Sequence, residues 1–234
     1  MSFSDDIEKE VKRIFRQPWT TTEATTVPET GSIALESNVA REIPSGVVLY
    51  SDLKQSTALV ESRSREIAAE VYRAFLYSAA QIVRNEGGDV TAYDGDRVMA
   101  VFMGTTPNTN AALAALKINR AVKSVINPAL SAQYGAQAYQ VTHVTGIDSS
   151  SLFVARAGVR GDNDLVWIGR AANYAAKLTE ISGGAASYIT GAVYDAMTDR
   201  AKIGGNPARN MWDERTWTAM NAMRIFRSDW TYPI

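Results

Sequence analysis

The stretch "GGDVTAYDGDRVMAVF", residues 87–102, decides the fold and places Asp89, Asp94 and Asp96 ahead of an apolar run. Its two apolar segments flank the tight turn Asp94–Gly95–Asp96, and this pattern predicts a β-hairpin. Asp89 and Asp94 have the residue type that forms turns. Asp96 is either a third turn former or one half of an acidic metal site. The rest of the chain must distinguish these two interpretations.

Composition limits the kinds of site that the chain can build. Its 234 residues are 46% hydrophobic and carry a net charge of −1, enough for one sizeable core and without a basic footprint for nucleic acid or an anionic membrane. No apolar run approaches the roughly 18 residues of a membrane span. The chain has no cysteine, which excludes thiolate zinc sites and favours the cytoplasm. With His143 as the single histidine, expected to be structural, any metal must be held by carboxylates.

Strand-like and helix-like segments alternate along the chain, which predicts an α/β or α+β fold around a mixed sheet. We expect an amphipathic helix over residues 4–16, capped by Ser4, and an extended connector to residue 40. The predicted organisation is a helix and arm over 1–42, a globular domain over 43–200, and a Trp-rich tail over 201–234 that packs on the core or on a partner. Strands are expected at 46–52, 89–93, 97–103, 137–148, 152–159, 164–169 and 186–190, and helices at 56–86 (broken near 61–65), 108–126 and 170–182.

Asp52 ends the first predicted strand, and Asp96 lies in the hairpin turn. If that strand lies beside the hairpin, the two carboxylates share one edge of the sheet, where they repel each other and are stabilised by Mg²⁺ or Mn²⁺. Such a pair suits two-metal phosphoryl chemistry, although strand-end and turn aspartates remain the alternative. The helix that opens after Asp52 would offer free backbone N–H groups to a triphosphate, alongside Leu53, Lys54, Gln55, Ser56 and Thr57.

Four segments in order, "VVLYSDLKQST", "GGDVTAYDGDRVMAVF", "TGID" and "WIGRAANYAAKL", make residues 45–195 similar to a class III nucleotidyl cyclase catalytic domain. The resemblance implies a ferredoxin-like βαββαβ core with a mixed, mostly antiparallel sheet, working as a head-to-tail homodimer. It also implies that Asp52 and Asp96 hold two divalent cations, Mg²⁺ or Mn²⁺. Asn173 matches the residue that positions the ribose. Lys177 stands where the family has an arginine that stabilises the transition state. A lysine keeps the positive charge but cannot bind two phosphate oxygens at once as a guanidinium does. Arg170, one turn earlier, is a candidate to share that task.

The departures from the family concern base recognition. Purine cyclases read the base with polar side chains at the positions of Ala92 and Val166, neither of which can bond a purine edge. Tyr50 replaces a phenylalanine and should point to the same strand face as Asp52, which would narrow the pocket for a pyrimidine; the alternative is that it fills the core. This pattern resembles the pyrimidine cyclases of bacterial Pycsar antiphage systems, which make cyclic UMP or cyclic CMP.

The expected function is therefore a homodimeric, metal-dependent pyrimidine nucleotide cyclase with UTP favoured over CTP and with neither nucleic acid nor membrane as partner. Its product would be the 3′,5′-cyclic monophosphate, a second messenger in antiphage defence. A catalytically weak nucleotide-binding module, favoured by Lys177, is one alternative, and an adenylate cyclase with atypical base recognition is another. A diguanylate cyclase is excluded, because Gly87–Gly88 is expected to end a helix and the turn reads Asp-Gly-Asp.

Overall fold

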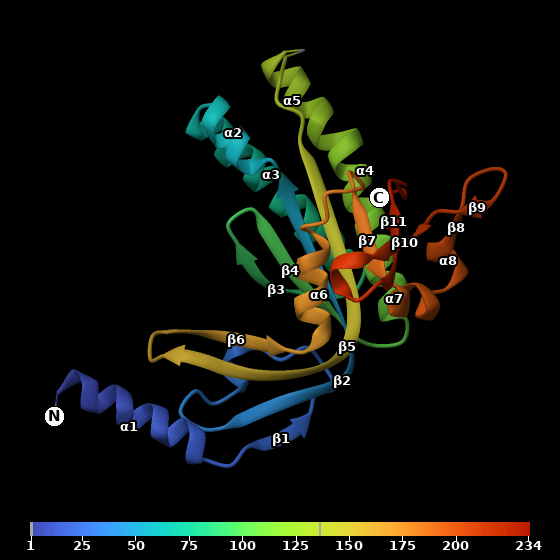
Figure 1. Ribbon diagram of the computed structural model, residues 1–234. Coiled ribbons are helices and arrows are strands. Elements are labelled where there is room, and N and C mark those ends of the chain that lie inside the picture. Colours follow the sequence, from blue (N-terminus) through green and yellow to red (C-terminus); the bar gives the residue numbers. More distant parts are fainter. Residues whose placement is uncertain (1, 136) are drawn as a thin grey trace.

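The computed structural model describes residues 2–135 and 137–234 and is built on one nine-stranded sheet (Figure 1). Its strands follow the order β10-β11-β7-β5-β2-β4-β3, with β1 added beside β2 and β6 beside β5. Among the described strands of this sheet, the β1–β2 and β5–β7 pairs are parallel and the others antiparallel. The strands are β1 Thr20–Glu23, β2 Val39–Lys54, β3 Gly88–Asp94, β4 Arg97–Phe102, β5 Thr142–Val159, β6 Asp162–Ile168, β7 Ser187–Thr190, β10 Asp213–Trp217 and β11 Met223–Ser228, with β8 Ile203–Gly204 and β9 Arg209–Asn210 as a separate pair.

The helices among the described residues connect these strands in the predicted order. They are α1 Phe3–Arg16, α2 Ser56–Ser62, α3 Arg65–Asn85, α4 Pro107–Ala121, α5 Asn127–Tyr134, α6 Arg170–Leu178, α7 Gly191–Ala196 and α8 Asp199–Lys202. The run β2-α3-β3-β4-α4-β5, with its strands side by side in the order β5-β2-β4-β3, is the predicted βαββαβ core. The mixed, mostly antiparallel sheet is confirmed, as is the helix break between α2 and α3.

The two faces of the sheet are covered differently. In β2 the side chains alternate, so that Val47, Leu49 and Leu53 pack with α3 and α4 in the main core, whereas Val48 and Tyr50 point to the opposite face. The short helix α6 lies on that second face and buries Ala171 and Ala175 against it. Asp52 follows Tyr50 by two residues, so it shares the face that α6 covers only in part.

The prediction of two strands over residues 137–159 was wrong, because β5 is a single strand of 18 residues. The serines at 149–151 suggested an interruption, yet Ser149 and Ser150 pair with β2, and Ser150 Oγ also accepts a hydrogen bond from the backbone N–H of Ala171. Tertiary pairing therefore overrides the local polar signal. The outer halves of β2 and β5 continue with β1 and β6 into an arm below the main body (Figure 1).

Four further elements differ from the sequence-based expectation. The first helix begins at Phe3 with Ser2 as its cap, and the connector contains β1, which pairs with the start of β2. The helix expected to end at residue 126 continues through a π-helical turn, Val122–Ile126, into α5. The segment expected as a tail contributes β10 and β11, and β11 pairs with β7 in the main sheet.

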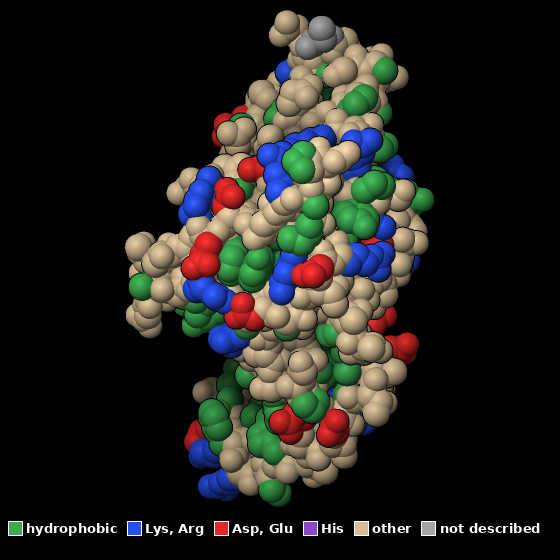
Figure 2. Space-filling model, turned by 90° about the vertical axis from the view of Figure 1, so that its right-hand side faces the viewer, with side chains coloured by type: hydrophobic (Ala, Val, Ile, Leu, Met, Phe, Trp, Pro, Cys, Tyr) green, Lys and Arg blue, Asp and Glu red, His purple; other side chains and the backbone are tan. Residues whose placement is uncertain are grey.

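Figure 2 shows Lys and Arg side chains interspersed with Asp and Glu over the face that it presents. Within residues 2–135 and 137–234, every helix is too short or too polar to cross a bilayer.

Candidate active site

Asp52 and Asp96 meet at one edge of the sheet. Asp52 of β2 lies directly opposite Arg97 of β4, and Asp96 precedes Arg97 in the β3–β4 turn. Burial raises the pKa of the Asp52 carboxyl; the Arg97 guanidinium, 3.5 Å from Asp52 Oδ2, opposes that rise, and the charge of Asp96 adds to it. The two carboxylates therefore lie at the same edge of the sheet, beside Arg97.

This pair fits a divalent cation. The Oδ2 atom of Asp96 is buried and has no hydrogen-bond partner among the described residues, which is costly for an ionised oxygen unless a cation reaches it. The described part of the chain gathers no group of three or more His, Cys, Asp or Glu side chains. Mg²⁺ is commonly bound through one or two carboxylates, with waters and substrate phosphates completing its shell. Asp52 and Asp96 match that donor set.

The segment after Asp52 is only partly suited to contact substrate through side chains. Leu53 is buried in the main core, so it can offer a ligand only its backbone. Lys54 donates a hydrogen bond of 2.6 Å to the carbonyl of Thr179, just beyond α6. Gln55 has a left-handed backbone (φ 59°) and precedes α2, which begins at Ser56, with Thr57 exposed in its first turn.

A cavity of about 460 Å³ is lined by four residues that the sequence analysis predicted, from different segments, to contact the nucleotide. Tyr50, Ala92, Val166 and Asn173 all lie on its wall, which is completed by β3, β4, β6 and α6. The side chains of this cavity that can be charged are Asp94 and Arg97.

Asp94 and Arg97 line this cavity, which no sequence motif indicated. Asp94 was interpreted as a turn former, and Arg97 was not singled out, although it directly follows the predicted metal ligand. The Arg97 guanidinium lies 5.9 Å from the centre of the Tyr50 ring. Burial raises the pKa of the Tyr50 phenol; Arg97 opposes this rise and Asp94 adds to it. Arg97 thus links the acidic pair to the cavity.

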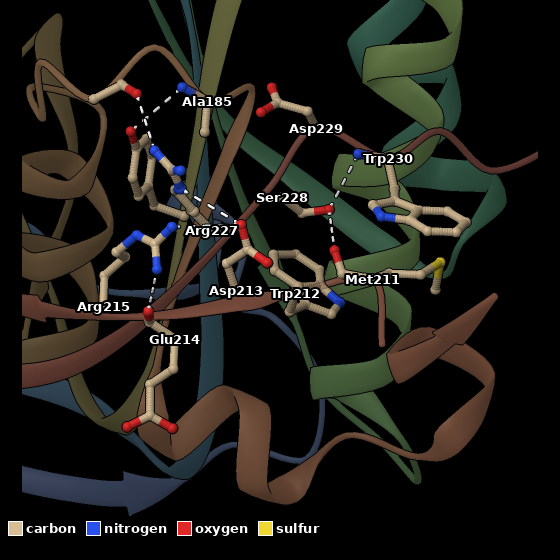
Figure 3. A network of polar contacts seen from close by, with 12 residues as sticks. Ala185, Met211, Trp212, Asp213, Glu214, Arg215, Arg227, Ser228, Asp229 and Trp230 are labelled. Carbon is tan, nitrogen blue, oxygen red and sulfur yellow. Dashed lines mark hydrogen bonds and ion pairs between the residues drawn. The ribbon is translucent and has the colours of Figure 1, made fainter. Parts of the chain in front are cut away.

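A second cavity, of about 610 Å³, lies beyond the other end of α6 and is rich in basic groups. Lys177, which is exposed and makes no ion pair with a described residue, lines it together with Arg215 of β10 and Arg227 of β11. Figure 3 shows Arg215 and Arg227 beside Asp213, their shared acidic neighbour, at distances of 3.5 and 3.8 Å. Glu180 also lines this cavity, so its three basic side chains have two acidic neighbours and keep a surplus of one positive charge for an anion. Because the arginines lie in the Trp-rich segment, no local motif marked them.

Arg170 is held by the fold, in contrast to its predicted role at the substrate. Its guanidinium contacts the fully buried carboxylate of Asp148 at 3.0 and 3.3 Å and donates to the carbonyl of Ser149 at 2.6 Å. Asp148 in turn accepts a hydrogen bond from the hydroxyl of Thr190. These contacts anchor the start of α6 on β5 and leave Arg170 poorly placed to share the task of Lys177.

The close seating of α6 depends on Gly146 of β5. A Cβ atom at this position would overlap the carbonyl oxygen of Ala175, so only glycine allows the helix to approach. Asn173 and Lys177, four residues apart, then stand on one face of α6 and open into the two cavities.

Curated proteins similar to this chain carry one description. Over 234 residues, covering the whole of both chains, it is 47% identical to a "Uridylate cyclase" of Xanthomonas perforans and 45% identical to one of Burkholderia cepacia. The chain belongs to the uridylate cyclase family. It is therefore a nucleotidyl cyclase, as the four sequence segments predicted. A scan against protein-family models finds no match.

Solved structures confirm the class III cyclase fold. A bacterial light-regulated adenylyl cyclase is similar with a TM-score of 0.67 and 18% identity, over 83% of this chain and 54% of that one. The adenylyl cyclase CyaB from P. aeruginosa is similar with a TM-score of 0.63 and 22% identity, over 81% of this chain and 95% of that one. The guanylyl cyclase Cya2 is similar with a TM-score of 0.65 and 17% identity, over 80% of this chain and 93% of that one. At these identities the likeness concerns the fold alone.

Proposed function

We propose that this cyclase converts UTP into 3′,5′-cyclic UMP and pyrophosphate. The observation that carries the proposal is the 460 Å³ cavity, in which Tyr50, Ala92 and Val166 form the wall where purine cyclases would place polar base-reading groups. The uridylate cyclase description of the relatives from Xanthomonas perforans and Burkholderia cepacia supports the choice of base.

The polar groups of the cavity suit a pyrimidine edge. Uracil offers two carbonyl acceptors and one N–H donor. Arg97 can only donate hydrogen bonds and an ionised Asp94 can only accept them, so together they match one carbonyl and the adjacent N–H. Cytosine also presents an acceptor beside a donor, and the preference for uracil therefore rests on the relatives.

The remaining site residues bind the ribose and the phosphates of the nucleotide. Asn173 orients the ribose so that its 3′-hydroxyl faces the α-phosphate, and Lys177 with Arg215 stabilises the negative charge of the phosphates. Asp52 and Asp96 hold two Mg²⁺ or Mn²⁺ ions, which when bound lower the pKa of the attacking hydroxyl and neutralise the leaving pyrophosphate. The backbone of residues 53–57, with Lys54, Ser56 and Thr57, borders the triphosphate.

The working unit in this proposal is a homodimer with two equivalent sites. Neither of the two cavities beside α6 is lined by Asp52 or Asp96. A second chain related by two-fold symmetry would bring its acidic pair to the ribose and phosphates held by Asn173 and Lys177. In keeping with the resemblance to Pycsar cyclases, we further propose that the product is a second messenger of antiphage defence.

Incubation with each of the four nucleoside triphosphates and Mn²⁺ or Mg²⁺, followed by mass spectrometry, tests the activity. We expect cyclic UMP as the main product and none without a divalent ion. Cyclic AMP or cyclic GMP as the main product would refute the pyrimidine assignment. Binding of UTP without any cyclic product would instead favour a nucleotide-binding module, to which the single-point charge of Lys177 lends some weight.

A further inference from the structure

Helix α1 carries an apolar stripe that the rest of the chain leaves uncovered. None of its residues is buried, and Phe3, Ile7, Val11 and Ile14 are 81, 50, 43 and 43% exposed. Their spacing of four, four and three residues places them on one face. In Figure 1, α1 extends away from the arm at the lower edge of the molecule. An isolated helix of this length is marginal in water, so its stripe is expected to be buried against a partner.

The direction of α1 is fixed at its C-terminal end. The buried Asn38 side chain donates hydrogen bonds to the carbonyls of Ile14 and Gln17 at 2.8 and 2.7 Å. Arg13 donates to the carbonyl of Glu36 at 2.7 Å, and Ser2 closes the N-terminus with a capping box. These contacts hold the helix in place with its apolar stripe accessible.

The charges of α1 indicate what covers the stripe. Its acidic side chains lie toward the N-terminus (Asp5, Asp6, Glu8, Glu10) and its basic ones toward the C-terminus (Lys9, Lys12, Arg13, Arg16), giving 4 − 4 = 0 net charge. An antiparallel copy would place the acidic half of each helix against the basic half of the other, whereas a parallel copy would align like charges. Helices that bind anionic membranes need a basic polar face, which α1 lacks.

We propose that α1 docks antiparallel onto α1 of a second copy of this chain, about a two-fold axis at the level of Lys9. Ile7 of each helix then packs against Val11 of the other, and the halves of opposite charge lie side by side. Two helices of 14 residues bury less than the roughly 1,000 Å² of a stable interface, so this contact reinforces another surface between the same two copies. The inference does not depend on UTP being the substrate.

Single cysteines test the geometry directly, because the chain has none of its own. Glu10→Cys lies near the proposed axis, where two cysteines can reach disulfide distance. The matched control Ser4→Cys lies five residues from the axis, which separates it from its counterpart by roughly 15 Å. After mild oxidation of the full chain we expect a disulfide-linked dimer for Glu10→Cys and none for Ser4→Cys. Linkage of both would indicate a parallel pair and linkage of neither would refute the docking.

A second variant measures how much the apolar stripe of α1 contributes to self-association. Ile7→Asp with Val11→Asp should weaken self-association at least tenfold in analytical ultracentrifugation. Ser4→Ala, an exposed and uncharged position of α1 outside the stripe, should not. Unchanged association of the double variant would overturn the proposal. So would binding of the parent chain, but not the double variant, to phosphatidylglycerol vesicles, because a membrane would then be the occupant.

Discussion

The two faces of the central sheet differ in how their buried charged side chains are paired. On the face covered by α3 and α4, the buried Lys117 and Glu86 form an ion pair of 2.6 Å, Nζ to Oε1. On the face covered by α6, Asp96 Oδ2 is buried without a partner and the ionised form of Asp52 is disfavoured. The ion pair on the first face stabilises the fold, whereas Asp52 and Asp96 on the second face remain available to bind a ligand. Substitutions on the two faces should therefore affect different measurements.

The largest effect is expected for Asp52→Asn on the α6 face. Losing a carboxylate that holds divalent ions removes several kcal/mol of charge stabilisation, about 1000-fold in turnover. Since the fold raises the pKa of Asp52, removal of its charge should not lower the melting temperature. Cyclic nucleotide release and thermal unfolding are measured together, with Asp89→Asn, an exposed position on β3, as the control. Turnover within threefold of the parent would exclude Asp52 from the metal site.

Lys117→Met on the opposite face should give the reverse pattern. Glu86 would be left buried without its partner, which typically costs 3–5 kcal/mol (order of magnitude). The free energy of unfolding in urea should fall by about that amount, while turnover per folded molecule stays the same. The double variant Glu86→Gln with Lys117→Met should recover part of the loss. An equal loss in single and double variants would mean that the packing of Lys117, and not the pairing, matters.

His143 gives the α3 face a dependence on pH. It is buried, its ring centre lies 5.9 Å from that of Phe75, and burial lowers its pKa to about 3, with the Lys123 charge assisting. Between pH 6.5 and about 3 the unfolded chain binds a proton that the folded chain does not. Stability from this residue is therefore complete above pH 6.5 and is lost on acidification by roughly 1 kcal/mol per pH unit.

The variant His143→Gln should flatten that dependence. Urea unfolding of parent and variant at pH 7.0, 5.5 and 4.5 compares the two slopes, so that any constant loss from the substitution cancels. Equal slopes would show that the carboxylates alone determine acid sensitivity.

How far the sequence predicts this molecule depends on whether a feature is local. The β3–β4 hairpin and the helix break follow from residues close in sequence, and the structure confirms them. The meeting of Asp52 with the hairpin turn depends on the pairing of β2 with β4, which the resemblance to the cyclase family implied and no local motif gives. The role of Arg170 could not be read this way, because its partner Asp148 lies 22 positions away on another element. Arg215 joins Lys177 only through the pairing of β11 with β7, and the continuity of β5 depends on β2.

Tyr50 provides the smallest expected effect and the finest test of the α6 face. Tyr50→Ala would enlarge the cavity where the ring now lies beside Arg97, which should admit a larger base. We expect the preference for UTP over ATP, as a ratio of kcat/KM values, to fall about tenfold, the scale on which pocket shape discriminates between ligands. Tyr93→Ala is the matched control, since Tyr93 is a 54% exposed tyrosine on the neighbouring β3 and does not line this cavity. If both variants keep the parental preference, size exclusion by Tyr50 does not select the base, and the pairing of Arg97 and Asp94 with the pyrimidine edge must account for it alone.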